Sequence, residues 1–161
     1  MIIKMRIDDR LLHGQVVYSW NSALSFDAIV IADENAANDE VRKMALKMSN
    51  PDGVRLAIRN VEDAVKLVKN PKLQSMKVFV IFSNPKEAFE FIEKIDEEPV
   101  LNIGGMQKKD NTVLLSPAVY VSKEDIEYLD KIQEKGIELE VRQVPDEKVK
   151  NYTTLKNKLS F

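Results

Sequence analysis

The stretch Val78-Phe-Val-Ile-Phe82, followed at once by Ser83-Asn84-Pro85, is the clearest structural signal in the chain. Five consecutive β-branched and aromatic residues predict a strand that is buried on both faces of a sheet. A serine or asparagine next to a proline predicts a capped helix that begins directly after this strand. A buried strand that leads into a helix is the repeating unit of a parallel α/β sheet.

The alternation of strands and helices continues along the chain. Further strands are predicted at residues 2–7, 28–32, 54–58, 100–103, 112–115, 119–121 and 137–144. Further helices are predicted after capping residues at positions 38, 60 and 122. The order predicts an open, doubly wound α/β fold with a mostly parallel sheet, helices on both faces and a single domain over residues 1–161. Residues from about 148 to 161 are polar and predict a C-terminal helix or tail.

The helix predicted after Asn38 carries a distinct apolar stripe. Val41, Met44, Ala45 and Met48 recur at the i, i+3, i+4, i+7 spacing. This spacing is typical of an amphipathic helix that packs its apolar side on a core.

The composition narrows the classes of function. A chain of 161 residues with a net charge of −2 suits one soluble domain and has no overall positive field to hold nucleic acid. The absence of cysteine excludes disulfides and thiol catalysis, and a single histidine argues against a metal site. No apolar run approaches the roughly 20 residues of a spanning helix, and the N-terminus lacks a signal-peptide core. We therefore expect a cytoplasmic protein without direct membrane insertion.

In a parallel α/β sheet, ligands bind beyond the carboxyl ends of the strands. The segments that follow the predicted strands there are polar or glycine-rich: residues 6–15, residues 33–39, Ser83-Asn84 and Gly104-Gly105. We expect these segments to meet at one edge of the sheet.

The first of these segments contains the only histidine of the chain, His13. A neutral imidazole is a good nucleophile towards phosphorus, and Arg6 and Arg10 can offset the roughly two negative charges of a phosphoryl group. Gly14 and Gln15 are expected to begin a helix whose free amides favour a phosphate. Asp8 or Asp9 could orient the imidazole or the arginines. On the residues alone, phosphoryl transfer through His13 is one hypothesis for this segment.

Each of these features also has a simpler interpretation. A lone histidine with nearby Arg and Asp residues is often only a surface ion-pair cluster. Gly104-Gly105 is often a turn. Asp33 to Asp39 fits a polar loop that ends in a helix cap, and Ser83 fits a helix cap equally well. These alternatives stay open on the residues alone.

The sequence Arg-Ile-Asp-Asp-Arg-Leu-Leu-His-Gly-Gln-Val at residues 6–16, followed by Trp20, resembles the active-site signature of the mannose/fructose/sorbose-family phosphotransferase system (PTS) IIB components. Further segments that resemble the family lie at residues 32–33, 37–39, 102–106, 116–121 and 143–145. The resemblance runs from residue 1 to about residue 147.

The resemblance implies an open, mostly parallel α/β sheet and a phosphohistidine at His13. It implies a phosphoryl donor that is a IIA protein, here a separate chain, and a sugar acceptor bound by the membrane components IIC and IID. Such a protein associates peripherally with the membrane through IIC and IID, and its step needs no metal or organic cofactor. The sugar stays open, and we expect a fairly flat docking surface around His13.

The family pattern also suggests roles for further residues. Arg6 and Arg10 would stabilise the phosphohistidine, with Arg10 the stronger candidate. Asp8, Asp33 and Asn38 would support the site. Gly104 and Gly105 would let the backbone approach the phosphate, and Ser83 is a further phosphate-binding candidate.

Three other classes of protein share parts of this pattern. A receiver-like protein needs an aspartate after the third strand, where this chain has Arg59-Asn60, and a lysine after the fifth, where it has Gly104. A nucleotide- or flavin-binding module needs a glycine motif that the chain lacks. A regulatory protein that uses His13 phosphorylation only as a signal cannot be separated from a transport component by sequence.

Overall fold

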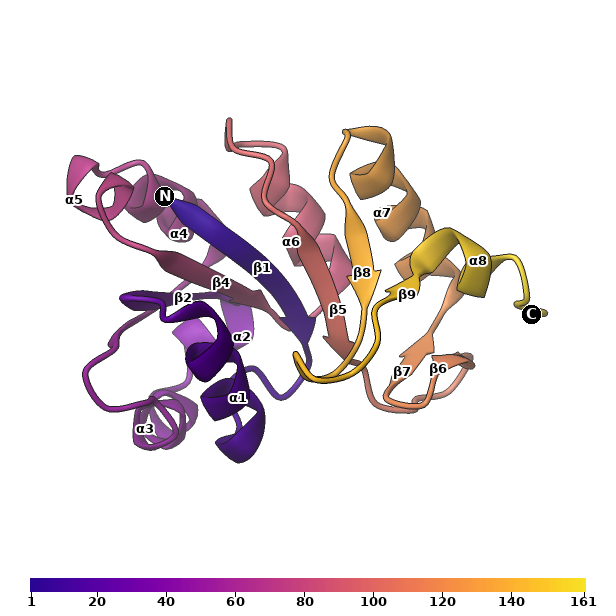
Figure 1. Ribbon diagram of the computed structural model, residues 1–161, viewed down its shortest axis with the longest axis horizontal. Coiled ribbons are helices and arrows are strands. Elements are labelled where there is room, and N and C mark those ends of the chain that lie inside the picture. The colour runs from indigo at the N-terminus through magenta and orange to yellow at the C-terminus, as the bar shows by residue number, and fades with distance from the viewer.

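A computed structural model describes all of residues 1–161. The protein forms a central sheet of seven strands (Figure 1). In sheet order the strands are β3 (Arg55–Arg59), β2 (Ala28–Ala32), β4 (Val78–Phe82), β1 (Ile2–Asp8), β5 (Leu101–Gly105), β8 (Leu139–Val141) and β9 (Lys150–Asn151). Every neighbouring pair is parallel except β8 and β9. A separate antiparallel pair consists of β6 (Val113–Ser116) and β7 (Val119–Val121). The predicted open, mostly parallel sheet is confirmed.

Helices cover both faces of this sheet, as predicted. One face packs against α4 (Val61–Val68), α6 (Pro85–Ile92) and α7 (Lys123–Glu134), around a core cluster of 28 buried residues. The other face carries α1 (Gly14–Leu24), α2 (Glu34–Ala37) and α3 (Glu40–Met48), around a smaller cluster of 12. The short helices α5 (Pro71–Gln74) and α8 (Tyr152–Lys156) lie near opposite ends of the sheet in Figure 1 and pack Leu73 and Tyr152 on the larger cluster.

Alternate side chains of strand β4 pack into the two core clusters. Val78, Val80 and Phe82 belong to the larger cluster, whereas Phe79 and Ile81 belong to the smaller one. Successive side chains of a strand point to opposite faces, so a strand that is buried on both sides needs an unbroken apolar run. Its predicted bounds are confirmed.

Strand β1 lies at the point where the direction of winding changes. The strands that follow it first, β2 and β3, lie on one side of it, and the later strands β5 and β8 lie on the other. Ligand sites of doubly wound sheets form beyond the carboxyl end of the strands at such a point. A ligand site is therefore expected at the carboxyl end of β1.

The predicted last strand, residues 137–144, is too long. The strand β8 ends at Val141, and the Arg142 side chain that follows donates to Glu140 at 2.6 Å and to the carbonyl of Pro145. The chain from residue 142 then leaves the sheet and returns as the antiparallel β9.

The prediction for α3 is wrong in two respects. The cap is Asp39, whose carboxylate accepts from the Arg42 amide, rather than Asn38. The apolar stripe faces solvent: Val41, Met44 and Met48 are 79%, 66% and 87% exposed. Arg42 and Leu46 lie on the side of the helix that faces the domain, where Arg42 donates to a backbone carbonyl and Leu46 is buried.

The C-terminal residues are ordered against the domain. Tyr152 is fully buried and donates its hydroxyl to Asp130 at 2.9 Å, and Lys156 pairs with the same carboxylate. No helix of the structure combines the length and apolar character needed to span a bilayer.

Candidate functional site

The loop after β1 is held by two buried leucines. Leu11 and Leu12 are 2% and 3% exposed and belong to the smaller core cluster, and the Leu11 amide donates to the Asp8 carbonyl at 2.8 Å. Leu11 adopts a positive φ of 63°, which turns the chain sharply before α1. The tight turn leaves Asp9 and Arg10 outside and puts His13 at the N-cap of α1.

The imidazole of His13 is held from one side by Asp8. Its Nε2 lies 2.7 Å from Asp8 Oδ2, and the same oxygen accepts a 2.8 Å hydrogen bond from Arg6 Nη2. The other carboxylate oxygen accepts from the Arg10 amide at 3.0 Å. Burial by itself raises the pKa of Asp8, but the hydrogen bond from His13 and the charge and hydrogen bond of Arg6 outweigh it and hold that pKa below its usual value.

This geometry assigns the two ring nitrogens different roles. An ionised Asp8 can only accept, so the Nε2 atom of His13 carries the hydrogen and donates it. In a neutral imidazole the Nδ1 atom then keeps its lone pair. The first amides of α1, at Gly14 and Gln15, receive no side-chain cap from His13, so they are available to an anion.

Arg6 lies behind the site rather than in it. Its side chain is 2% exposed and donates to Asp8, to Asn102 Oδ1 at 2.7 Å and to the Gln143 carbonyl at 2.9 Å. Burial lowers the pKa of Arg6, although Asp8 opposes the shift. Both terminal nitrogens of its guanidinium donate to these buried partners, and Arg6 does not line the pocket beside His13.

The glycines of β5 accommodate these side chains. A Cβ atom at Gly104 would lie 2.0 Å from Arg6 Nη1, so this glycine makes room for the guanidinium. Gly105 lies against Asp8 and also lines the pocket beside His13. The expected approach of backbone to phosphate fits Gly105 alone.

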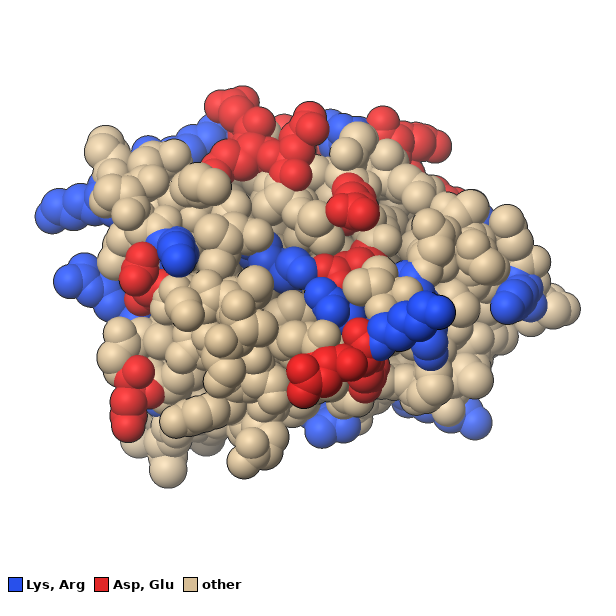
Figure 2. Space-filling model, in the orientation of Figure 1, with Lys and Arg blue, Asp and Glu red and all other residues tan.

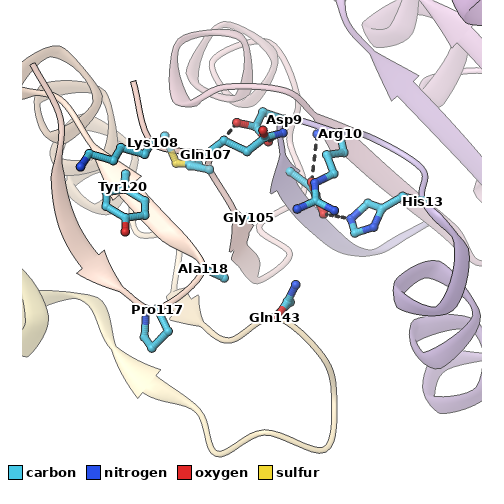
Figure 3. Close-up of a pocket in the computed structure, with 12 residues that line it drawn as sticks. Asp9, Arg10, His13, Gly105, Gln107, Lys108, Pro117, Ala118, Tyr120 and Gln143 are labelled. Atoms are coloured by element: carbon cyan, nitrogen blue, oxygen red, sulfur yellow. Dashed lines mark hydrogen bonds and ion pairs between the residues drawn. The ribbon is translucent and has the colours of Figure 1, made fainter. Parts of the chain in front are cut away.

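A pocket of about 400 Å³ opens beside His13 (Figure 3). Figure 3 shows Arg10 and His13 on one side and Lys108 and Tyr120 across from them, with Gln143 below. The side chains of Arg10 and Lys108 are exposed and make no ion pair or hydrogen bond in the structure. The pocket thus has one unpaired cation, Arg10, on the side of the imidazole and a second, Lys108, across from it, and it is hollowed where a fairly flat docking surface is expected.

Asp9 connects the loop of His13 to the loop after β5. Its carboxylate accepts from the Gln107 amide at 2.7 Å and from the Gln107 side chain at 3.3 Å. Its own amide donates to the Gly105 carbonyl at 3.1 Å. These contacts hold the loop that carries Arg10 against the loop that carries Lys108.

The predicted residues Asp33, Asn38 and Ser83 are not brought to this pocket. Asp33 is the N-cap of α2, Ser83 Oγ donates to the Asp33 carboxylate, and Asn38 donates to the carbonyl of Glu34. They belong to a separate network at the ends of β2 and β4. In that network burial and the neighbouring Asp33 raise the pKa of Glu87 to about 7.

Several residues of the pocket were missed by sequence reasoning. Lys108 and Gln107 directly follow the Gly-Gly-Met segment, whereas Tyr120 and Gln143 lie within segments that resemble the family. The resemblance marked these segments without giving them a role. No group of three or more His, Asp or Glu side chains in the structure could hold a metal ion.

The family model and the similar proteins of known name indicate the same family for this chain. The family model of the PTS system sorbose subfamily IIB component matches residues 2–161. The sorbose-specific EIIB component of Lacticaseibacillus casei is 37% identical over 145 residues, which cover 89% of this chain and 88% of the relative. The corresponding component of Klebsiella pneumoniae is 32% identical and is covered to 95% by the match.

The fold agrees with the same relatives. The crystal structure of the IIBSor domain of the sorbose permease from Klebsiella pneumoniae superposes with a TM-score of 0.94 at 32% identity, covering 100% of this chain and 99% of that one. The chain belongs to the sorbose subfamily of PTS IIB components, a family of phosphotransferases.

Proposed function

We propose that this protein accepts a phosphoryl group from a phosphorylated IIA protein on Nδ1 of His13 and transfers it to a sugar held by the membrane components IIC and IID. It works in the cytoplasm, at the membrane surface. The observation that carries this proposal is the 2.7 Å contact of His13 Nε2 with Asp8, which leaves Nδ1 free as the nucleophile.

In the first step the Nδ1 lone pair attacks the phosphorus of the donor phosphohistidine. The Nδ1–P bond forms while the bond between phosphorus and the donor imidazole breaks. The ring of His13 gains positive charge, which the Asp8 carboxylate offsets through Nε2–H. Arg10 and Lys108 stabilise the three phosphoryl oxygens from the pocket.

In the second step a sugar hydroxyl oxygen attacks the same phosphorus. The Nδ1–P bond breaks, the electron pair returns to Nδ1 and the hydroxyl proton leaves to a base. The oxygen–phosphorus bond of the sugar phosphate has then formed and His13 is neutral again. Arg6 acts throughout as a positioning residue, because it holds Asp8 in place without reaching the pocket.

The test is a reconstituted transfer with labelled phosphoenolpyruvate, the general phosphotransferase proteins, a IIA protein and this chain. Wild type is expected to take up an acid-labile, base-stable label that His13→Gln lacks. A second reaction adds membranes that contain IIC and IID, where the label is expected on sugar. Label on His13 that never reaches sugar would favour a regulatory protein instead.

A further inference from the structure

Helix α3 has its apolar side turned outward. Val41, Met44, Ala45 and Met48 form one stripe and all face solvent, while Leu46 is the only buried residue of the helix. A surface helix normally buries such a stripe, because exposed aliphatic area costs roughly 25 cal/mol per Å². A contiguous exposed stripe of this kind marks a surface that a partner covers. We name these four residues the α3 stripe.

Helix α3 also carries two exposed charged residues, Glu40 and Lys47, beside the α3 stripe. Tyr18 of α1, on the same face of the sheet, is 63% exposed. Figure 2 shows that the surface over α1 is largely free of Lys, Arg, Asp and Glu side chains, whereas acidic side chains lie at the lower left edge, near α3. The exposed area is therefore wider than α3 alone.

Helix α3, which carries the stripe, contacts the loop of His13 from its inner side. Arg42, next to Val41, donates from Nη2 to the Asp9 carbonyl at 3.4 Å, and Asp9 lines the pocket beside His13. From Val41 to Met48 the stripe extends about 10 Å along the helix. An ordinary protein interface of ~800 Å² per partner has a radius of roughly 16 Å, so an interface centred on His13 extends well beyond the pocket.

We propose that the α3 stripe is part of the surface on which the phosphoryl-donor protein docks. This inference rests on the proposed function, since it assumes that a donor meets this chain at His13. The donor carries a doubly negative phosphoryl group to the unpaired cations Arg10 and Lys108 at the centre of the contact. An apolar contact beside this centre adds affinity without adding charge.

The charges at the pocket favour the donor over two other occupants. Cytoplasmic loops of membrane proteins carry an excess of Lys and Arg, which Arg10 and Lys108 repel. A second copy of the chain, related by a two-fold axis at the site, would bring the same cations against each other. Methionine side chains suit a brief contact, because they adapt to a partner without rigid complementarity.

The test compares the variant V41Q/M44Q/M48Q with F161Q. Phe161 is a matched control, because it is 51% exposed but lies at the C-terminus, at the other end of the molecule from α3 (Figure 1). Gln keeps the side chains long and suits a helix. The second-order rate constant for transfer from the phosphorylated donor is expected to fall roughly tenfold or more in the triple variant, through KM rather than kcat. F161Q is expected to stay at the wild-type value, and M48Q alone to fall between.

A small donor separates docking from chemistry. Phosphoramidate needs no protein interface, so all variants are expected to be phosphorylated by it at the wild-type rate. A triple variant that is slow with phosphoramidate as well, or that keeps the wild-type rate with the protein donor, overturns the inference.

Two further outcomes would assign the stripe to another occupant and also overturn the inference. One is normal transfer from the donor with reduced transfer to sugar in membranes that contain IIC and IID. The other is a wild-type dimer that the triple variant dissociates. A wild-type chain that takes no phosphoryl group from the protein donor contradicts the proposed function itself.

Discussion

The Nε2 atom of His13 lies 2.7 Å from Oδ2 of Asp8, and this contact determines which ring nitrogen can react. Asp8→Asn removes the negative charge that offsets the positive charge of the imidazole ring during transfer. The Asn side chain can also present either its oxygen or its nitrogen to the ring. Transfer to His13 is expected to fall on the order of 100-fold, as for other carboxylates that orient a catalytic histidine. Measured kcat with the protein donor, and its pH profile, check this. An Asp8→Asn protein that is folded and fully active contradicts the role given to Asp8.

Arg10 and Arg6 are expected to respond in opposite ways. Arg10 is exposed and unpaired, so Arg10→Gln is expected to change stability by less than about 0.5 kcal/mol and to slow transfer roughly 100-fold. Arg6 is buried in a hydrogen-bonded ion pair, so Arg6→Gln is expected to lower the free energy of unfolding by roughly 3–5 kcal/mol. Urea denaturation measures the stability of the two variants, and transfer kinetics measure their activity. The reverse pattern would mean that Arg6, rather than Arg10, contacts the phosphoryl group.

The adjacent glycines of β5 form a second matched pair. A Cβ at Gly104 would lie 2.0 Å from Arg6 Nη1, whereas one at Gly105 would lie 3.2 Å from Asp8 Oδ1. Gly104→Ala must move the guanidinium and is expected to cost roughly 1–3 kcal/mol of stability, with slower transfer. Gly105→Ala is expected to cost less. Equal melting temperatures for Gly104→Ala and wild type would show that Arg6 moves aside freely.

Glu87 gives the stability of the protein a pH dependence. Its pKa in the folded protein is about 7, against an ordinary value of 4.5, because of its burial and of the neighbouring Asp33. Between these values the folded state binds more protons than the unfolded state, so the free energy of unfolding falls as pH rises from about 4.5 to 7. Glu87→Gln is expected to remove this part of the slope. Unfolding curves at several pH values check it, and an identical slope in both proteins would contradict the raised pKa.

The strands could be predicted well because their signal is local. Val78–Phe82 and Ala28–Ala32 are buried on both faces, and an unbroken apolar run suffices to identify such strands. The α3 stripe misled the prediction for the opposite reason. Its periodicity is local, but its orientation depends on Arg42, which contacts the distant Asp9 and Asp33.

The site was predicted in part for similar reasons. His13, Asp8 and Arg10 lie within one short loop, so their meeting needs no knowledge of the fold. Lys108 and Gln143 reach the pocket only because β1 neighbours β5, and β5 neighbours β8. The burial of Arg6 could not be predicted from the sequence either, because its partners Asn102 and Gln143 are about 100 and 140 residues away along the chain.

The most direct test of the central claim is to identify the phosphorylated nitrogen by NMR, after transfer from the phosphorylated donor to ¹⁵N-labelled protein. His13 is the only histidine, so its ring nitrogens give a single, unambiguous set of signals. We predict a phosphoryl group on Nδ1, with Nε2 still carrying the hydrogen that it donates to Asp8. A phosphoryl group on Nε2, or an unmodified His13 in phosphorylated protein, would contradict it.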